Sequence, residues 1–334
     1  MYFYIDISFY LYRLMKTLTD LVKDSFIGFA LGDALGVPVE FESREWLKEN
    51  PVNGMLGNMR YNQPPGTWSD DSSMVFCTTE SLCGGYDLEN IALQFSKWKN
   101  ERFWTPRGRV FDIGVQTSKA IERIDRFFEM GLRIKPIPEE GVNEKENGNG
   151  SLMRILPLAF FLRDRKPEES LRIIYEVSAL THAHPRAVTG CLIYIHFIIS
   201  LLHGQDKNRA YMSIRNLMPD LCRSTSTVCE LEHYSRILSS NIADYPESSI
   251  RSSAYVVHTL EAALWCVMRN DNYVNTVLQA VNLGEDTDTV AGLAGGIAGI
   301  LYGEDQIPQE WIKVLARRKD ILDLAGRFSK SLLH

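Results

Sequence analysis

The spacing of the apolar residues constrains this chain most, because it follows the repeat of a helix nearly everywhere. An apolar stripe begins at Leu21 and Val22 and continues through Phe26 to Ala30, as on a helix with one buried face. Alternating β-branched runs bounded by turn residues, which mark strands, are nearly absent. Similar stripes recur over residues 88–98, 113–128, 171–180, 188–202, 256–267 and 276–283. We therefore predict an all-α fold.

Two long irregular stretches interrupt the helical pattern. Residues 42–66 are rich in Pro and Gly, and residues 133–150 end in Glu-Asn-Gly-Asn-Gly. Loops of this length within a domain usually carry function or move. Helical segments resume directly after each stretch, so neither is expected to be a linker. A length of 334 residues allows one large domain or two modest ones.

Charge and hydropathy exclude two classes of partner. The chain has 36 Lys and Arg against 42 Asp and Glu, a formal charge of −6, which does not favour a nucleic acid. The longest uncharged runs, 187–202 and 289–303, are shorter than the roughly 20 residues that span a bilayer. We predict that both are buried helices and expect no membrane partner.

The first 14 residues are aromatic but make a poor signal peptide. They have no basic start and no small-residue cleavage site, and Asp6 and Arg13 interrupt them. We therefore expect a cytoplasmic protein. Met15 begins a better helix entry, with Thr or Asp as a cap. Residues 1–14 are thus either translated from an upstream start or an arm that binds a partner, and the main domain is predicted over 15–334.

Two acidic clusters stand at predicted helix entries. The first is Ser69-Asp70-Asp71, followed by an apolar run, and the second contains Asp286, Asp288 and Thr289. Both can be explained as helix caps, because Ser and Asp accept hydrogen bonds from the first N–H groups of a helix. The second cluster, however, offers more acceptors than one helix end can use.

The residues after the second cluster favour a metal site instead. Residues 290–299 contain four glycines on a predicted helix, each costing up to about 1 kcal/mol against Ala, which implies close backbone approach. Four aspartates brought together would repel one another, and two divalent cations would remove the repulsion. Oxygen ligands without an obvious His or Cys indicate Mg²⁺ or Mn²⁺. The candidate ligands are Asp70, Asp71, Asp286 and Asp288 with the hydroxyls of Ser69 and Thr289.

The clusters belong to a series of six ordered motifs between residues 21 and 302. These are GFALGDALGVPVEF (28–41), GTWSDDS (66–72), FDIG (111–114), GNGSLMR (148–154), THAH (181–184) and GEDTDT (284–289). The series resembles the ADP-ribosylglycohydrolases. That resemblance implies an all-α, single compact domain with a dinuclear Mg²⁺ or Mn²⁺ centre in the floor of an ADP-ribose cleft.

The resemblance places the six candidate ligands on the metal-binding positions of the family, with two departures. Ser69 stands where Thr is commoner and keeps the hydroxyl, and Glu285 adds a charge where many relatives have Gly. It also implies that Glu40 is a general base or acid, and that Asp112 contacts substrate or donates a proton. From the residues alone, Glu40 could be an ordinary loop carboxylate and Asp112 a helix N-cap.

A Gly-rich turn supplies a candidate anion site. Asn149, Gly150 and Ser151 precede a predicted helix over residues 152–161, and N–H groups at a helix N-terminus suit a diphosphate. A plain loop-to-helix turn is the alternative. The resemblance implies that His182 contacts ribose or phosphate, whereas His184 before a proline is expected to be a turn residue.

The expected function is hydrolysis of the glycosidic bond between ADP-ribose and an acceptor. We expect removal of mono-ADP-ribose from arginine of a modified protein, with ADP-ribose as product. Hydrolysis of another linkage, to serine or a small molecule, stays open, as does a non-catalytic binding or structural role. A further alternative is immunity against an ADP-ribosylating toxin, through reversal of the modification or capping by residues 1–14.

Overall fold

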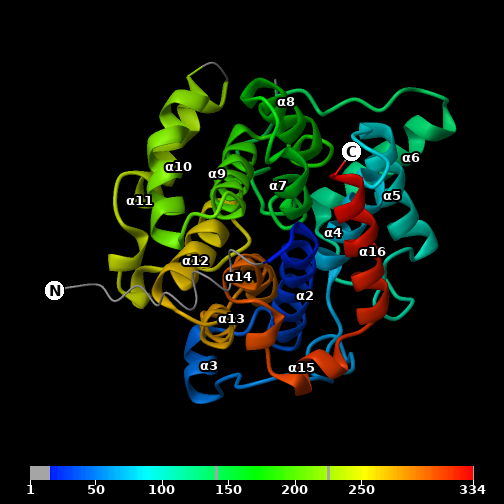
Figure 1. Cartoon of the computed structure of the whole chain (residues 1–334). Helices are drawn as coiled ribbons and strands as arrows, with labels where there is room; N and C mark the ends of the chain where they lie inside the picture. Colours follow the sequence, from blue (N-terminus) through cyan, green and yellow to red (C-terminus); the bar gives the residue numbers. More distant parts are fainter. Residues whose placement is uncertain (1–15, 140–141, 224–225, 334) are drawn as a thin grey trace.

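Helices supply the regular structure in residues 16–139, 142–223 and 226–333, the parts that this computed structural model describes (Figure 1). No strand occurs within those ranges. The predicted arm of residues 1–14 lies outside them. The α-helices are α2 (Leu18–Gly36), α3 (Arg44–Glu49), α4 (Asp70–Leu82), α5 (Leu88–Glu101), α6 (Val115–Glu129), α7 (Leu156–Leu162), α8 (Pro167–Ser178), α9 (Pro185–Leu202), α10 (Lys207–Cys222), α11 (Ser235–Leu238), α12 (Val256–Arg269), α13 (Tyr273–Asn282), α14 (Thr287–Tyr302), α15 (Gln309–Val314) and α16 (Arg318–Ser331). Short 3-10 helices are η1 (Val37–Val39), η2 (Ser226–Tyr234), η3 (Ile242–Asp244), η4 (Glu247–Ser249) and η5 (Glu304–Gln306). The all-α prediction is confirmed.

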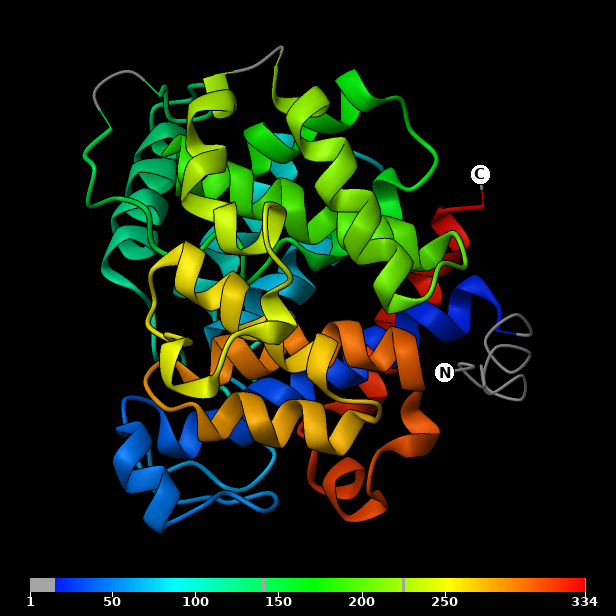
Figure 2. The ribbon, with the colours of Figure 1, turned by 90° about the vertical axis from the view of Figure 1, so that its left-hand side faces the viewer.

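The central helix pair of the fold joins two segments that lie far apart in the sequence. Helices α2 and α14 make the most extensive contact between any two elements, and they lie side by side at the centre of the molecule (Figures 1 and 2). Glycines on both helices face backbone: a Cβ at Gly32 would lie 2.0 Å from the carbonyl oxygen of Ala291, and one at Gly295 would lie 2.4 Å from that of Gly28. The glycines of α14 therefore permit the close approach that the sequence predicts.

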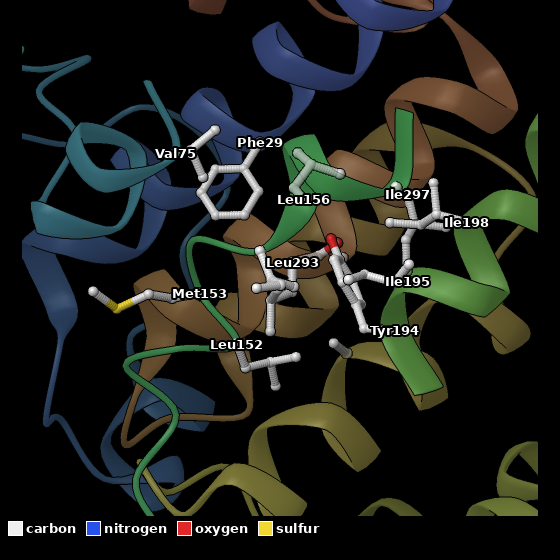
Figure 3. Close-up of a cluster of buried hydrophobic side chains, with 14 of the residues drawn as sticks. Phe29, Val75, Leu152, Met153, Leu156, Tyr194, Ile195, Ile198, Leu293 and Ile297 are labelled. Atoms are coloured by element: carbon white, nitrogen blue, oxygen red, sulfur yellow. The ribbon is translucent and has the colours of Figure 1, made fainter. Parts of the chain in front are cut away.

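The core continues from this pair into α7 and α9. Phe29 of α2, Leu156 of α7 and Tyr194 of α9 are all fully buried, and Figure 3 shows them around Leu293 and Ile297 of α14. The hydroxyl of Tyr194 donates to the carbonyl of Leu293 at 3.1 Å, so this buried phenol has a partner. A single apolar cluster thus supports the helix ends that carry the acidic residues.

The long apolar run at residues 187–202 forms part of α9, the one helix in the described residues that is long and apolar enough to cross a membrane. Of its residues, 78% are buried inside the protein. This agrees with the prediction of a buried helix. The run at 289–303 lies largely in α14, whose residues are buried throughout.

One predicted helix begins at the wrong residue. The sequence predicts a helix over 152–161, but α7 begins at Leu156, and the residues before it form turns. Pro157 stands in the first turn of α7, where its fixed φ and missing N–H are tolerated. Upstream, the buried Arg154 donates to the carbonyl oxygens of Gly150 and Val177, so its side chain holds a turn in place. The Gly-rich turn is therefore not at a helix N-terminus.

Candidate metal centre and active site

The first acidic cluster is positioned by a carboxylate on α2. Asp33 is fully buried, and its Oδ1 accepts from the backbone N–H of Ser69 at 2.8 Å. Its Oδ2 accepts from the N–H of Ser72 at 3.0 Å and from the Ser72 hydroxyl at 2.5 Å. These bonds fix the N-terminus of α4, where Ser69 is the N-cap and Asp70 and Asp71 occupy the first turn. Ser69 accepts from the N–H of Asp71 at 3.2 Å, so the cap that the sequence allows is present.

The second acidic cluster lies at the N-terminus of α14, against the end of α2. A Cβ at Gly36 would lie 2.3 Å from the backbone nitrogen of Asp288, and the hydroxyl of Thr287 donates to the Gly36 carbonyl at 2.8 Å. Asp286 is the N-cap residue of α14 but makes no side-chain capping bond. Its Oδ2 instead accepts from Asn149 Nδ2 at 2.6 Å. The side chain of Asp286 is thus directed toward the site rather than toward its own helix.

A third group of carboxylates closes the site. Glu40 follows η1 and is 4% exposed, and Asp112 lies just before α6 with a left-handed φ of 63°. The phenol oxygen of Tyr61 is 2.6 Å from both Glu40 Oε2 and Asp112 Oδ1. Glu40, Asp112 and Asp288 each offer one oxygen, and these three oxygens lie within 4.8 Å of one another. Because the N-cap of α6 is Gly114, the explanation of Asp112 as a helix cap is wrong.

Burial dominates the electrostatics of these acids. Burial, together with repulsion from Asp112, raises the pKa of Glu40 to about 9. At Asp112 itself, burial raises the pKa against hydrogen bonds from neighbouring groups and the positive charge of Arg60, which lower it. The same cause, burial, raises the pKa of Asp70, Asp71, Asp286 and Asp288. Six acids in one buried cluster need positive charge or protons to coexist.

Five of these six acids, all but Asp288, line a cavity of about 250 Å³. Gly148, Asn149, Gly150 and His182 also line this cavity, as do Lys145 and the first residues of α6. His182 packs tightly on this turn, because a Cβ at Gly150 would lie 2.5 Å from His182 Cε1. Burial, with the nearby charge of Arg154, lowers the pKa of His182 to about 3. The imidazole is therefore neutral at physiological pH, and its Nδ1 is 2.7 Å from the Thr181 hydroxyl.

The structure brings most of the predicted site residues to this one cavity. Those that line it are Glu40, Asp70, Asp71, Asp112, Asn149, Gly150, His182, Asp286 and Thr289. Ser69 directly precedes the lining residue Asp70, and Asp288 offers an oxygen within 4.8 Å of those of Glu40 and Asp112. Ser151 does not line the cavity: it is fully buried, and its hydroxyl lies 3.6 Å from Cys191 Sγ. His184 is the N-cap of α9, as expected for a turn residue. The role of each residue in metal or substrate binding stays a prediction.

Sequence reasoning missed two residues that organise the site, Asp33 and Tyr61. Asp33 lies inside the first motif. The available signal was an isolated acidic residue within an otherwise apolar helical stretch. Tyr61 lies in the irregular stretch 42–66, where nothing in the local pattern distinguishes it. Lys145 and Gln116, which also line the cavity, were not predicted either.

The acidic cluster has the chemistry of a divalent cation site. Asp71 Oδ2 is buried and has no hydrogen-bond partner among the described residues, which is costly for a carboxylate oxygen unless a cation completes it. Carboxylate oxygens are the ligands that Mg²⁺ and Mn²⁺ prefer. The residues present therefore fit such a metal.

Comparison with known proteins agrees with the site. Residues 15–333 match the sequence profile described as ADP-ribosylglycohydrolase. The chain is 33% identical over 313 residues to an ADP-ribosylarginine hydrolase Tri1 of Serratia proteamaculans, covering 92% of this chain and 78% of that protein. It is 28% identical over 300 residues to the ADP-ribosyl-[dinitrogen reductase] glycohydrolase of Rhodospirillum rubrum, covering 89% and 90%.

A solved structure has the same fold. It is described as an ADP-ribosylglycohydrolase-related protein complex, and it superposes with a TM-score of 0.74 at 28% identity. The alignment covers 94% of this chain and 98% of that one. The likeness therefore extends over nearly the whole helical domain.

Proposed function

The chain belongs to the ADP-ribosylglycohydrolase family, and from this premise we propose that it is a metal-dependent hydrolase that removes mono-ADP-ribose from arginine side chains of a modified protein. The observation that carries the proposal is one cavity that is lined by both a cluster of buried acids and a Gly-rich turn. Two relatives named ADP-ribosylarginine hydrolases, each 33% identical, support arginine as the acceptor.

Two divalent cations, Mg²⁺ or Mn²⁺, are proposed to bind between the ends of α4 and α14. The proposed ligands are Asp70, Asp71, Asp286 and Asp288, with the hydroxyls of Ser69 and Thr289. When bound, such cations supply charge stabilisation for oxygen atoms at the reacting carbon. The side chain of Asn149, which donates to Asp286 Oδ2, would keep that carboxylate oriented.

Glu40 and Asp112 are proposed to move the protons of the reaction. They share the Tyr61 hydroxyl, whose single proton can be donated to only one carboxylate at a time. This arrangement holds both carboxylates at one edge of the cavity, within reach of a sugar whose anomeric carbon lies beside the acids. One of them can accept a proton from the attacking water while the other donates one to the leaving guanidine nitrogen.

The part of the cavity that is lined by the start of α6 and by residues 148–150 is proposed to bind the diphosphate. Helix α6 has no side-chain cap at Gly114, and its first residues line the cavity, so the positive end of its dipole favours an anion there. Lys145 adds a positive charge to the lining of the cavity. The neutral His182 can hydrogen-bond to a ribose hydroxyl without adding charge. A diphosphate would thus lie between α6 and the 148–150 turn.

The test is release of ADP-ribose from two matched substrates, one linked through arginine and one through serine, with Mg²⁺ or Mn²⁺ present. We expect release from the arginine-linked protein, and a loss of about 100-fold or more in Asp70→Asn and Asp288→Asn, which remove charge but little volume. Asp87→Asn is the control, because Asp87 caps α5 outside the cavity and Asn caps equally well.

Three results would contradict the proposal. Unchanged release after chelation, or in both site variants, would exclude the metal assignment. Release from the serine-linked substrate alone would move the acceptor to another linkage. Absence of release from any substrate, with intact metal binding, would favour a non-catalytic role.

A further inference from the structure

The mouth of the cavity carries an exposed aromatic ring directly beside a candidate catalytic acid. Phe41 follows Glu40 in the chain, lines the cavity and is 54% exposed. Single exposed apolar side chains are common on protein surfaces, so the informative feature is the position of this ring at the cavity rather than its exposure alone. The proposed metal and diphosphate sites do not use this ring, which leaves it available to the acceptor part of a substrate.

The backbone holds Phe41 in an unfavourable conformation. Its φ is 63°, in the left-handed region that aromatic residues rarely adopt, and Glu285 opposite it has a φ of 60°. The two residues are bound together: the N–H of Phe41 donates to the Glu285 carbonyl at 2.6 Å, and the N–H of Glu285 donates to the Glu42 carbonyl at 2.9 Å. Two backbone hydrogen bonds between residues 41–42 and Glu285 thus hold the strained conformation that places this ring at the cavity.

A guanidinium already lies on the ring. The guanidinium carbon of Arg60 is 4.5 Å from the centroid of the Phe41 ring and 5.9 Å from that of Tyr61. Among the described residues no carboxylate lies within ion-pair distance of Arg60, so stacking is its principal contact. The positive charge of Arg60 nevertheless favours the ionised form of Asp112. The mouth of the cavity thus accepts a planar cation on aromatic rings, next to Glu40 and Asp112.

We propose that Phe41 and Tyr61 form an acceptor subsite that binds the guanidinium of the modified arginine by stacking, and that Arg60 occupies this subsite until substrate displaces it. The inference rests on the proposed function, because it places the leaving guanidine beside the acids that would protonate it. A serine linkage presents no planar cation, so the subsite discriminates for arginine.

The expected effects have the size of an exposed cation–π contact. Removing the ring in Phe41→Leu is expected to weaken binding of a guanidinium about two- to fivefold, and removing the internal competitor in Arg60→Ala to strengthen it by a similar factor. Opposite changes in guanidinium affinity from these two neighbouring substitutions would distinguish a stacking subsite from a general disturbance of the loop.

Agmatine, a guanidinium with no ADP-ribose attached, is the probe for the experiment. Its binding to the full-length protein is measured by saturation-transfer NMR, and KM is measured with the arginine- and serine-linked substrates. We expect agmatine affinity to follow the order Arg60→Ala, wild type, Phe41→Leu, and KM for the arginine-linked substrate to change in parallel. The control is Arg209→Ala, which removes an exposed arginine of α10 that does not line the cavity.

Agmatine binding separates failure of the subsite from failure of the proposed hydrolysis. If the wild type releases ADP-ribose from arginine but neither variant changes agmatine affinity or KM, the subsite is wrong and the hydrolase function stands. If agmatine binds in the expected order but only the serine-linked substrate is cleaved, the acceptor assignment under the proposed function is wrong while the guanidinium site stands. Equal changes of KM for both linkages would overturn discrimination by this subsite.

Discussion

Replacing Gly32 by alanine should break the contact on which the acidic site depends. A Cβ there would lie 2.0 Å from the carbonyl oxygen of Ala291, whereas ordinary contact begins at 3.4 Å. The Cβ is attached directly to the backbone of α2, and the atom it meets belongs to the backbone of α14. The two helices must therefore separate locally by about 1.4 Å, the difference between those two distances. No side chain can move aside to relieve the overlap.

Replacing Gly32 by alanine should therefore destabilise the protein, whereas the same replacement at an uncrowded helix position usually stabilises it. Alanine gains about 1 kcal/mol in helix propensity over glycine, but overpacking against backbone costs about 1–3 kcal/mol or more. We expect a cost near the upper end of this range, about 3 kcal/mol, and hence a net loss of about 2 kcal/mol, equivalent to a fall of roughly 3 °C in Tm for a protein of this size. Gly326→Ala is the control, because Gly326 lies on α16 with nothing within 4 Å of its Cβ position.

Two measurements on each variant test the reasoning. Thermal unfolding should show a lower Tm for Gly32→Ala and an unchanged or higher Tm for Gly326→Ala. ADP-ribose release should fall about 100-fold in Gly32→Ala alone, since Asp33 is the next residue and a displacement of about 1 Å at the site is costly. A rise in Tm for both variants would refute the claim that backbone contact between α2 and α14 is limiting.

Three further changes have expected outcomes. Asp33→Asn should lower the Tm by an amount equivalent to about 1–3 kcal/mol even in chelator, because an amide cannot accept all three bonds that Asp33 accepts. Arg154→Met should destabilise more, by about 2–4 kcal/mol, since the buried carbonyls that Arg154 contacts lose their donor. Burial raises the pKa of Glu261 to about 7, against the opposing charge of Arg236. The folded state therefore binds this proton more tightly, and stability is lost as pH rises from about 4.5 through 7. Urea midpoints of Glu261→Gln, which does not titrate, should exceed those of the wild type increasingly between pH 5 and 8.

The sequence predicts what depends on periodicity and on short local patterns. Apolar stripes locate the helices, and the glycines of residues 290–299 indicate that their helix approaches another backbone closely, although they do not identify α2 as the partner. The acidic clusters are likewise visible, because helix entries collect Ser and Asp in recognisable order. Their meeting in one cavity follows only from their expected chemistry and from the resemblance to a family.

What the sequence does not predict depends on tertiary contacts. The start of α7 at Leu156 is set by Pro157 and by the bonds of Arg154 to a turn and to α8, which a local pattern does not contain. Tyr61 joins Glu40 to Asp112 across 21 and 51 residues of chain. A contact of this kind produces no periodic pattern in the sequence, so only the folded structure identifies it.

The pairing of α2 with α14 has a consequence for how the protein is made. The bond from Thr287 to Gly36 spans 251 residues, and at about 5–20 residues per second a ribosome needs roughly 13–50 s to synthesise that distance. During this interval α2, apolar over most of its surface, has been synthesised without the helix that buries it. Chaperones are thus expected to bind the nascent chain for longer than its length alone would suggest. Products truncated before α14 would carry Asp70 and Asp71 but never assemble a site.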